Sequence, residues 1–354
     1  MAAVPVQNIY YLLCYAWDEF APKQLEKVAA EQFPDAVHLF ARLLATGVRS
    51  LHQRGFETGY VTLEQATSSP RGRILMGETL RLVATQPSRV CCTFDEMSVD
   101  VLTNQILKAS LGRVLETEGL DRDIRAEVRQ ARRLFDQVSD IELTPRVFYQ
   151  VRVHQNNRLY AFLVNVCRFL FDSLQALDHA GGYKFQDVLR EPERLRRIYE
   201  KFVRNFYRRC QNAYAVKRDR MDWVGSPLGG ADFGLVPQME TDVTLRSSVR
   251  TIVVECKYTE SIYQQNYFKG KFRSEHLYQL SAYLQNLEPG GEGILLYPTA
   301  GVAVDQSYML HGHRVRVATL DLDRPWPKIA SSLLALLDLP VSTPANTHSL
   351  APST

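Results

Sequence analysis

One stretch of the chain places charged side chains inside what is otherwise the pattern of two buried β-strands. The runs Val236–Leu245 and Thr251–Tyr258 are rich in aliphatic and β-branched residues, and five residues separate them. These runs nevertheless contain Asp242, Glu255 and Lys257. A buried charge costs free energy unless it is paired or binds a metal. The stretch therefore predicts a β-hairpin that carries a functional site.

Side-chain alternation predicts which residues of this hairpin share a face. Odd-numbered residues of the second strand, which include Glu255 and Lys257, lie on one face, and even-numbered residues lie on the other. If the hairpin turns at residues 247–248, Asp242 falls opposite Val253. It is then diagonal to Glu255, with the two Cβ atoms about 7 Å apart. A slip of one residue would turn Asp242 to the opposite face.

Two carboxylates and a lysine in this arrangement suit a hard divalent cation. Mg²⁺ prefers oxygen ligands, takes one or two carboxylates and leaves places for water and phosphate. We expect Asp242, Glu255 and the main-chain carbonyl of Cys256 to hold one Mg²⁺, with Glu200 as a further ligand of a second ion or of a bound water. Lys257 would position the attacking water or offset negative charge. The alternative is an ordinary hairpin with a cross-strand salt bridge.

Helices are expected on either side of this hairpin in the sequence. Residues 189–210 have an apolar stripe with Glu200 at its edge. An acid at such an edge is either solvated or leans over a neighbouring sheet toward a metal. In the helix expected over residues 275–284, Gln279 and Tyr283 lie four positions apart and share a face. Basic side chains of the first helix would suit a phosphate backbone; they are Arg194, Arg196, Arg197, Lys201, Arg204, Arg208 and Arg209.

The rest of the second half continues a mixed α/β pattern. Residues 267–273, with Lys269, Lys271 and Arg273, form either a DNA-contact loop or a charged turn. Strands are expected over 293–298 and 315–321, and a closing helix over 326–337. Residues 339–354 are rich in Pro, Ser and Thr without periodicity, which predicts a disordered tail.

The first half predicts a separate mixed α+β domain. A short aromatic helix capped by Asn8 is expected near the start. Gly181-Gly182 is the best break between halves, so we expect domains over residues 1–180 and 181–338. The remaining first-half elements are helices over 35–54, 74–83, 97–117, 121–138 and from 159 onward, strands over 60–64 and 89–95, a solvated turn over 68–73 and an extended stretch over 145–152.

Composition bears on the compartment and the kinds of partner to expect for the protein. The formal net charge of +3 is too small to indicate nucleic-acid binding by itself. Six cysteines never fall in C-x-x-C spacing, which predicts reduced thiols. No signal peptide is apparent. The apolar run 159–177 is interrupted by Asn165, Arg168 and Asp172, which favours a buried helix over a membrane span. We expect a cytoplasmic protein with no membrane segment.

Several motifs stand together in one order. They are Glu200, Asp242, Glu255-x-Lys257 and Gln279-x-x-x-Tyr283. This order of helix, strand, strand, helix and strand resembles the PD-(D/E)xK nuclease superfamily, and the last motif is similar to that of its RecB-type branch. The runs Pro5–Trp17, Met239–Asp242 and Leu277–Leu280 also resemble the McrC family of McrBC modification-dependent restriction systems. That resemblance extends over nearly the whole chain up to about Leu339.

The resemblance implies a function and a set of residues. It implies a Mg²⁺-dependent endonuclease with a restriction-endonuclease-like fold, in which Asp242 and Glu255 bind metal and Lys257 is the catalytic lysine. The second acid is Glu here, where Asp also occurs in the family. The superfamily pattern adds Glu200, Gln279 and Tyr283.

The resemblance also implies partners. An McrB-like AAA+ GTPase ring would recognise methylated cytosine in double-stranded DNA, and the N-terminal half of this chain would dock on the ring and stimulate its GTP hydrolysis. The chain itself has no G-x-x-x-x-G-K-[ST] loop, so we expect it to bind no GTP. Two alternatives remain open. One is a stand-alone RecB-like repair nuclease, and the other is a non-catalytic activator of the ring.

Overall fold

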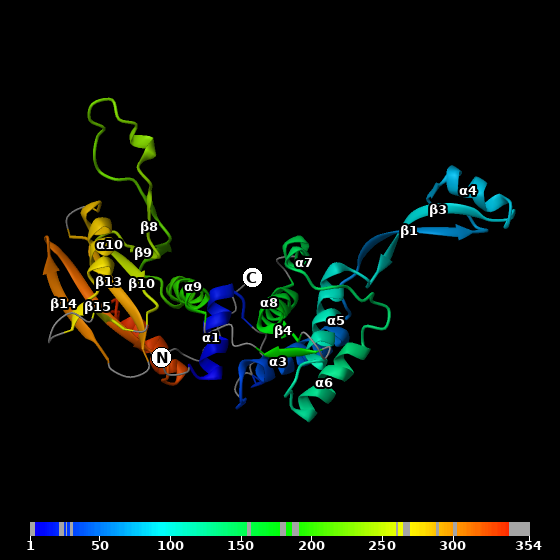
Figure 1. The fold of residues 1–354 in the computed structure, drawn as a ribbon, viewed down its shortest axis with the longest axis horizontal. Helices are drawn as coiled ribbons and strands as arrows, with labels where there is room; N and C mark the ends of the chain where they lie inside the picture. The colour runs from blue at the N-terminus through cyan, green and yellow to red at the C-terminus, as the bar shows by residue number, and fades with distance from the viewer. Residues whose placement is uncertain are drawn as a thin grey trace. The chain divides into compact units, whose positions relative to one another are not determined.

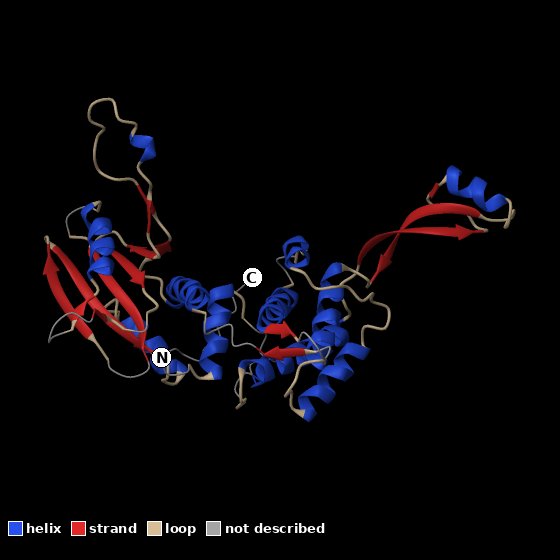
Figure 2. Ribbon diagram, viewed as in Figure 1, coloured by secondary structure: helices blue, strands red, loops and turns tan. Residues whose placement is uncertain are grey.

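The computed structural model of the protein describes residues 4–20, 25, 27–28, 31–153, 157–177, 182–185, 191–259, 261–264, 270–287, 290–299 and 303–339 (Figures 1 and 2). The chain folds into two compact units. The sheet unit holds the described residues of 4–20, 31–36 and 191–339. The helical unit holds those of 25–28 and 37–185.

The helical unit is built mainly from amphipathic helices. In its longest helix, Val37, Phe40, Leu44 and Val48 recur at helical spacing, and each is at most 2% exposed. No helix among the described residues is long and apolar enough to cross a membrane. The elements of this part of the chain are α3 (Ala36–Arg54), β1 (Gly59–Thr67), β2 (Arg73–Ile74), α4 (Met76–Val83), β3 (Val90–Ser98), α5 (Leu102–Leu115), α6 (Arg122–Arg133), α7 (Pro145–Gln150), α8 (Arg158–Ser173), β4 (Leu174–Ala176) and β5 (Tyr183–Phe185).

Strands β1 and β3 form a long antiparallel hairpin, with β2 on the other side of β3. The base of this hairpin is held by Asn104 of α5, which is fully buried. Its side-chain amide donates to the carbonyls of Glu57 at 2.9 Å and Val99 at 2.7 Å, and its Oδ1 accepts from the hydroxyl of Tyr160 at 2.6 Å. One buried amide therefore ties both ends of the hairpin to the helices.

The sheet unit is organised around a six-stranded mixed sheet in the order β14-β15-β13-β10-β9-β6. Strands β10, β13 and β15 are parallel to one another, and the pairs β14–β15, β9–β10 and β6–β9 are antiparallel. This agrees with the mixed central sheet expected from the sequence. The elements are α1 (Val6–Trp17), α9 (Pro192–Cys210), β6 (Ala215–Lys217), β7 (Arg220–Met221), η2 (Phe233–Leu235), β8 (Met239–Glu240), β9 (Val243–Arg246), β10 (Thr251–Cys256), β11 (Tyr263–Gln264), β12 (Lys271–Phe272), α10 (Ser274–Gln285), β13 (Glu292–Thr299), β14 (Asp305–Leu310), β15 (His313–Asp321) and α11 (Trp326–Ala335).

The two faces of the sheet pack against different helices. Ile252, Val254 and Cys256 of β10 pack in one core with α1, α9 and α11. Val253 packs in a second core with Leu280, Tyr283 and Leu284 of α10. The predicted alternation along β10 is therefore confirmed.

A glycine permits close packing between α10 and the sheet. A Cβ atom at Gly293 of β13 would lie 2.9 Å from side-chain carbons of both Leu280 and Leu284. A side chain at this position would force the side chains of Leu280 and Leu284 to shift.

Two local expectations were wrong. Residues 145–150 form a helix rather than an extended stretch, because Pro145 suits the first turn, where its missing N–H costs nothing. Helix α1 begins at Val6, so Asn8 lies inside its first turn and is not a cap. The Asn8 amide instead donates to the carbonyls of Leu322 and Arg324 at 2.8 and 2.9 Å.

The grouping of α1 with the sheet unit also differs from the expected division at residues 180 and 181. The break at Gly181, residues 265–269 with Lys269 of the expected DNA-contact loop, and the tail beyond residue 339 lie outside the described residues.

Candidate active site

The register of the β9–β10 hairpin differs from the expected one by two residues. The turn runs from Ser247 to Arg250, whose carbonyl accepts from the Ser247 N–H at 2.9 Å. Val253 consequently faces Thr244, whereas the sequence predicted that it would face Asp242. A two-residue shift keeps each side chain on its face, because the period of a strand is two. Asp242 immediately precedes β9, and continuing the ladder places it opposite position 255.

Two buried carboxylates meet at the end of β10. Asp242 is 9% exposed and Glu255 is 2% exposed. Oδ2 of Asp242 accepts from the main-chain N–H of Cys256 at 2.9 Å, and Oε1 of Glu255 accepts from Nζ of Lys257 at 2.8 Å. Oε2 of Glu255 is buried and has no hydrogen-bond partner among the described residues. A buried carboxylate oxygen without a donor is a place where a cation fits.

The electrostatics of this pair favour the binding of a positive charge. Burial, and then the negative charges of Glu255 and Glu200, raise the pKa of Asp242 to about 7. Burial also raises the pKa of Glu255, although Lys257 acts in the opposite direction. Two buried carboxylates that repel each other titrate as a pair and are relieved by a proton or a metal ion.

A chain of hydrogen bonds fixes the lysine. Nζ of Lys257 donates to Oε1 of Gln279 at 2.6 Å, and Nε2 of Gln279 donates to the hydroxyl of Tyr283 at 2.7 Å. That hydroxyl donates to the carbonyl of Glu240 at 2.9 Å. The structure thus brings Lys257, Gln279 and Tyr283 together, and it holds the ammonium group against Glu255.

Glu200 is placed differently from the other predicted residues. It belongs to α9, which packs on the face of the sheet opposite to α10. Its Oε1 accepts from Nε of Arg196 at 2.9 Å, one turn earlier on the same helix. Its negative charge contributes to the raised pKa values of Asp242 and Glu255.

Few side chains are available to bind a metal ion at this site. Within the described residues, no group of three or more His, Cys, Asp and Glu side chains has the geometry of a metal site. The predicted ligands Asp242 and Glu255 are two carboxylates, and the third, at Cys256, is a main-chain carbonyl.

Arg204 is a contact of the site that the sequence did not single out from the other basic residues of its helix. Its guanidinium Nη1 donates to the main-chain carbonyl of Asp242 at 3.0 Å. The sequence could have pointed to Arg204 because it lies four residues after Glu200, and residues at that spacing share a helix face.

The remaining cations of α9 divide into paired and unpaired groups. Arg208 and Arg209 form ion pairs with Asp18, whereas Arg197 and Lys201 are exposed and have no partner among the described residues.

In the loop expected to contact DNA, Lys271 lies on β12, which pairs with β11.

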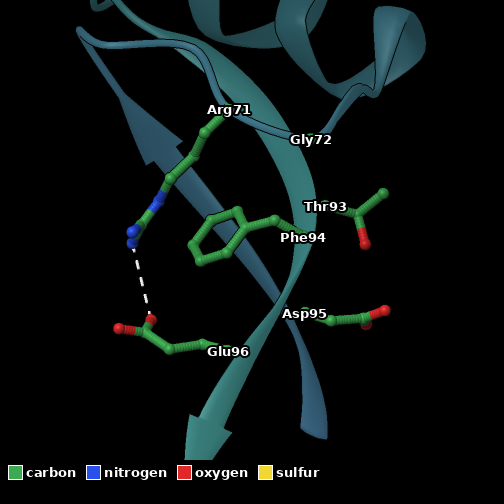
Figure 3. Close-up of a pocket in the computed structure, with 6 residues that line it drawn as sticks. All are labelled: Arg71, Gly72, Thr93, Phe94, Asp95 and Glu96. Carbon is green, nitrogen blue, oxygen red and sulfur yellow. Dashed lines mark hydrogen bonds and ion pairs between the residues drawn. The ribbon is translucent and has the colours of Figure 1, made fainter.

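A separate open depression of about 620 Å³ lies on the β1–β3 hairpin (Figure 3). The guanidinium of Arg71 lies 3.8 Å from the ring centroid of Phe94 and 3.5 Å from the carboxylate of Glu96. Asp95 accepts from the hydroxyl of Thr62 at 2.7 Å. The charged groups that line the depression already have partners, and residues 68–73 are exposed, as expected for a solvated turn.

Comparison with known proteins gives consistent matches. A family described as McrBC 5-methylcytosine restriction system component matches residues 7–298. A curated relative from Escherichia coli (strain K12), the type IV methyl-directed restriction enzyme EcoKMcrBC, is 33% identical over 342 residues, which cover 95% of this chain and 97% of the relative.

The fold also matches a solved structure. A refined half-complex from a tetradecameric assembly of Thermococcus gammatolerans McrB AAA+ hexamers with bound McrC superposes with a TM-score of 0.61 at 16% identity. The match covers 94% of this chain and 75% of the other. At this identity the likeness concerns the fold.

Proposed function

The chain belongs to the family of McrBC 5-methylcytosine restriction system components, and we propose that it is the endonuclease subunit of a modification-dependent restriction complex. It hydrolyses phosphodiester bonds of double-stranded DNA that contains methylated cytosine. The reaction takes place at the carboxylate pair of Asp242 and Glu255 beside Lys257, and it requires Mg²⁺.

The observation that carries this proposal is the unsatisfied oxygen of Glu255. Its Oε2 is buried without a donor among the described residues, while the other carboxylate oxygen is bound by Lys257. A buried ion pair that served stability alone would satisfy its remaining lone pairs, because an unpaired buried acceptor costs about 1–3 kcal/mol. The position of this oxygen next to Asp242 supports a binding site for a cation.

The residues present fit Mg²⁺. Asp242 and Glu255 would supply carboxylate oxygens and Cys256 a main-chain oxygen, which are the hard ligands that this ion prefers. When bound, Mg²⁺ supplies Lewis-acid polarisation of a phosphate and a more acidic water.

The other groups of the site hold Lys257 in place and offset the negative charge of the phosphodiester. Lys257 presents a positive charge that Gln279 and Glu255 hold from two sides. A fixed cation next to a phosphodiester stabilises the negative charge that develops during hydrolysis, without reorganising at the moment of reaction. Tyr283 keeps Gln279 in place through its own bond to the carbonyl of Glu240.

We further propose that the protein works with an McrB-like AAA+ GTPase. The solved neighbour contains McrC bound to McrB AAA+ hexamers, and the helical unit of this chain has no evident part in cleavage. Its β1–β3 hairpin exposes apolar side chains, with Tyr60 76% and Met97 60% exposed, which is typical of interaction surfaces. GTP would be bound by the partner, since this chain has no phosphate-binding loop of the G-x-x-x-x-G-K-[ST] type.

A reconstituted reaction tests the proposal. The chain is incubated with Mg²⁺ and plasmid that carries methylated cytosine, with and without the ring GTPase and GTP. We expect cleavage of methylated plasmid with the ring only, and none of unmodified plasmid. Cleavage of both plasmids without the ring would identify a stand-alone nuclease. Stimulated GTP hydrolysis with no cleavage under any condition would identify an activator without a nuclease.

A further inference from the structure

We propose that Arg204 is a positioning residue that fixes Asp242 for metal binding. This inference rests on the proposed function of the site. Arg204 would touch neither metal nor substrate and would act through the main chain of Asp242.

Asp242 needs such support because of where it lies. The β9–β10 ladder begins at Val243, so the strand pairing stops short of Asp242. Two different elements hold this residue instead. The N–H of Cys256 on β10 holds the carboxylate at 2.9 Å, and Arg204 of α9 holds the carbonyl at 3.0 Å. The two hydrogen bonds fix the residue at its side chain and at its backbone.

The surroundings of Arg204 strengthen this contact. Arg204 is half-buried, and burial lowers the pKa of its guanidinium, which nevertheless stays protonated. Hydrogen bonds from charged donors are stronger than those from neutral donors. The negative charges of Asp242 and Glu200 attract the guanidinium, whereas Arg218 repels it.

Arg204 differs from the other cations of its helix in how it is used. Arg196 pairs with the side chain of Glu200, and Arg208 pairs with that of Asp18. Arg204 instead reaches a main-chain oxygen that belongs to one of the two carboxylate residues. Groups that orient the ligands of a metal typically contribute about tenfold to a hundredfold in metal affinity.

The test measures metal binding separately from catalysis. Arg204→Met is compared with the wild type by calorimetric titration of the full chain with Mn²⁺ alone, and by the Mg²⁺ dependence of plasmid cleavage in the reconstituted complex. We expect Mn²⁺ affinity to fall about tenfold and the Mg²⁺ concentration for half-maximal cleavage to rise by about the same factor. The rate at saturating Mg²⁺ should fall by less than about threefold. Misfolding would lower that rate without moving the half-maximal concentration.

Arg316→Met is the matched control. Arg316 is also half-buried and also donates to a main-chain carbonyl, that of Leu336 at 3.2 Å, but it belongs to β15 and pairs with Asp305. This variant should lose stability with unchanged Mn²⁺ affinity. Unchanged affinity in Arg204→Met, or an equal loss in Arg316→Met, would overturn the role of Arg204 and leave the nuclease site standing. A wild-type protein that binds no Mn²⁺ would overturn both.

Discussion

The carboxylate of Asp242 accepts a hydrogen bond from the main-chain N–H of Cys256 at 2.9 Å, across 14 positions of sequence. This bond draws Asp242 to the end of β10, where Glu255 precedes Cys256 and Lys257 follows it. The acid that comes before the hairpin and the acid near its end are thereby joined in one site. The burial and mutual repulsion of these two carboxylates lower the stability of the metal-free protein.

Asp242→Asn should stabilise the metal-free protein at neutral pH. The folded-state pKa of Asp242 is raised from 3.8 to about 7, so the folded protein holds a proton that the unfolded chain has released. The stability from this group is full below about pH 4 and is lost as the pH rises through about 7. We expect the variant to gain roughly 1–3 kcal/mol at pH 8 and almost nothing at pH 4.

Urea unfolding in the presence of EDTA at the two pH values measures this difference. Asp323→Asn, which changes an exposed acid of the same unit, should show no gain at either pH. An Asp242→Asn variant that is less stable than the wild type at pH 8 would contradict the electrostatic account of the site.

Lys257→Ala should remove cleavage and leave the partner's GTP hydrolysis stimulated. The ammonium group is held at 2.8 Å from Glu255 and 2.6 Å from Gln279, where it can act on a phosphodiester. Removal of one such fixed charge typically costs about 10²–10³-fold in rate. Plasmid cleavage and phosphate release, measured in the same reconstituted mixture, separate the two activities.

The exposed Lys328 of α11 offers a control of the same residue type, and Lys328→Ala should cleave at the wild-type rate. Wild-type cleavage by Lys257→Ala would show that the lysine has no catalytic part.

Tyr283→Phe should slow cleavage about tenfold. The change removes the hydroxyl that accepts from Gln279 and donates to the carbonyl of Glu240. The two broken bonds, each worth about 1 kcal/mol, free Gln279 and with it the contact to Lys257. Tyr278 lies on the same helix and is 71% exposed, so Tyr278→Phe should leave the rate unchanged. Equal rates in the two variants would show that the chain of hydrogen bonds is not needed.

Asn104→Ala should destabilise the helical unit by roughly 2–3 kcal/mol, because it leaves the carbonyls of Glu57 and Val99 without their donor in a buried site. Chemical denaturation followed by circular dichroism measures the loss. The exposed Gln130 of α6 provides a control, and Gln130→Ala should unfold at the wild-type midpoint. Faster hydrogen exchange in β1 and β3 of Asn104→Ala would place the effect at the hairpin.

The sequence predicted those features of the sheet that depend on local periodicity. Alternation along β10 correctly separated Val253 from Ile252 and Val254, because each face is buried against its own helix. The same reasoning brought Gln279 and Tyr283 together on α10. These predictions need only the repeat of a strand or a helix, which the order of residues displays directly.

Features that depend on turn geometry or on contacts between distant residues could not be predicted from local periodicity. The hairpin was expected to turn one residue too early, and this error moved the partner of Val253 by two positions. Asn8 looked like a helix cap, but its amide binds carbonyls more than 300 positions away. Arg204 is one of many arginines in its helix, and only the fold shows which of them reaches Asp242.

The bonds from Asn8 to Leu322 and Arg324 also constrain how the protein is made. Helix α1 is synthesised before the helical unit, yet its place in the sheet unit exists only after β15 and α11 have been synthesised. The helical unit is inserted between these two parts of the chain and can complete its core while translation continues. A fragment that starts at residue 181 would expose the apolar surface on which Leu12 and Tyr15 pack, so fragments for expression should keep α1 joined to the sheet unit.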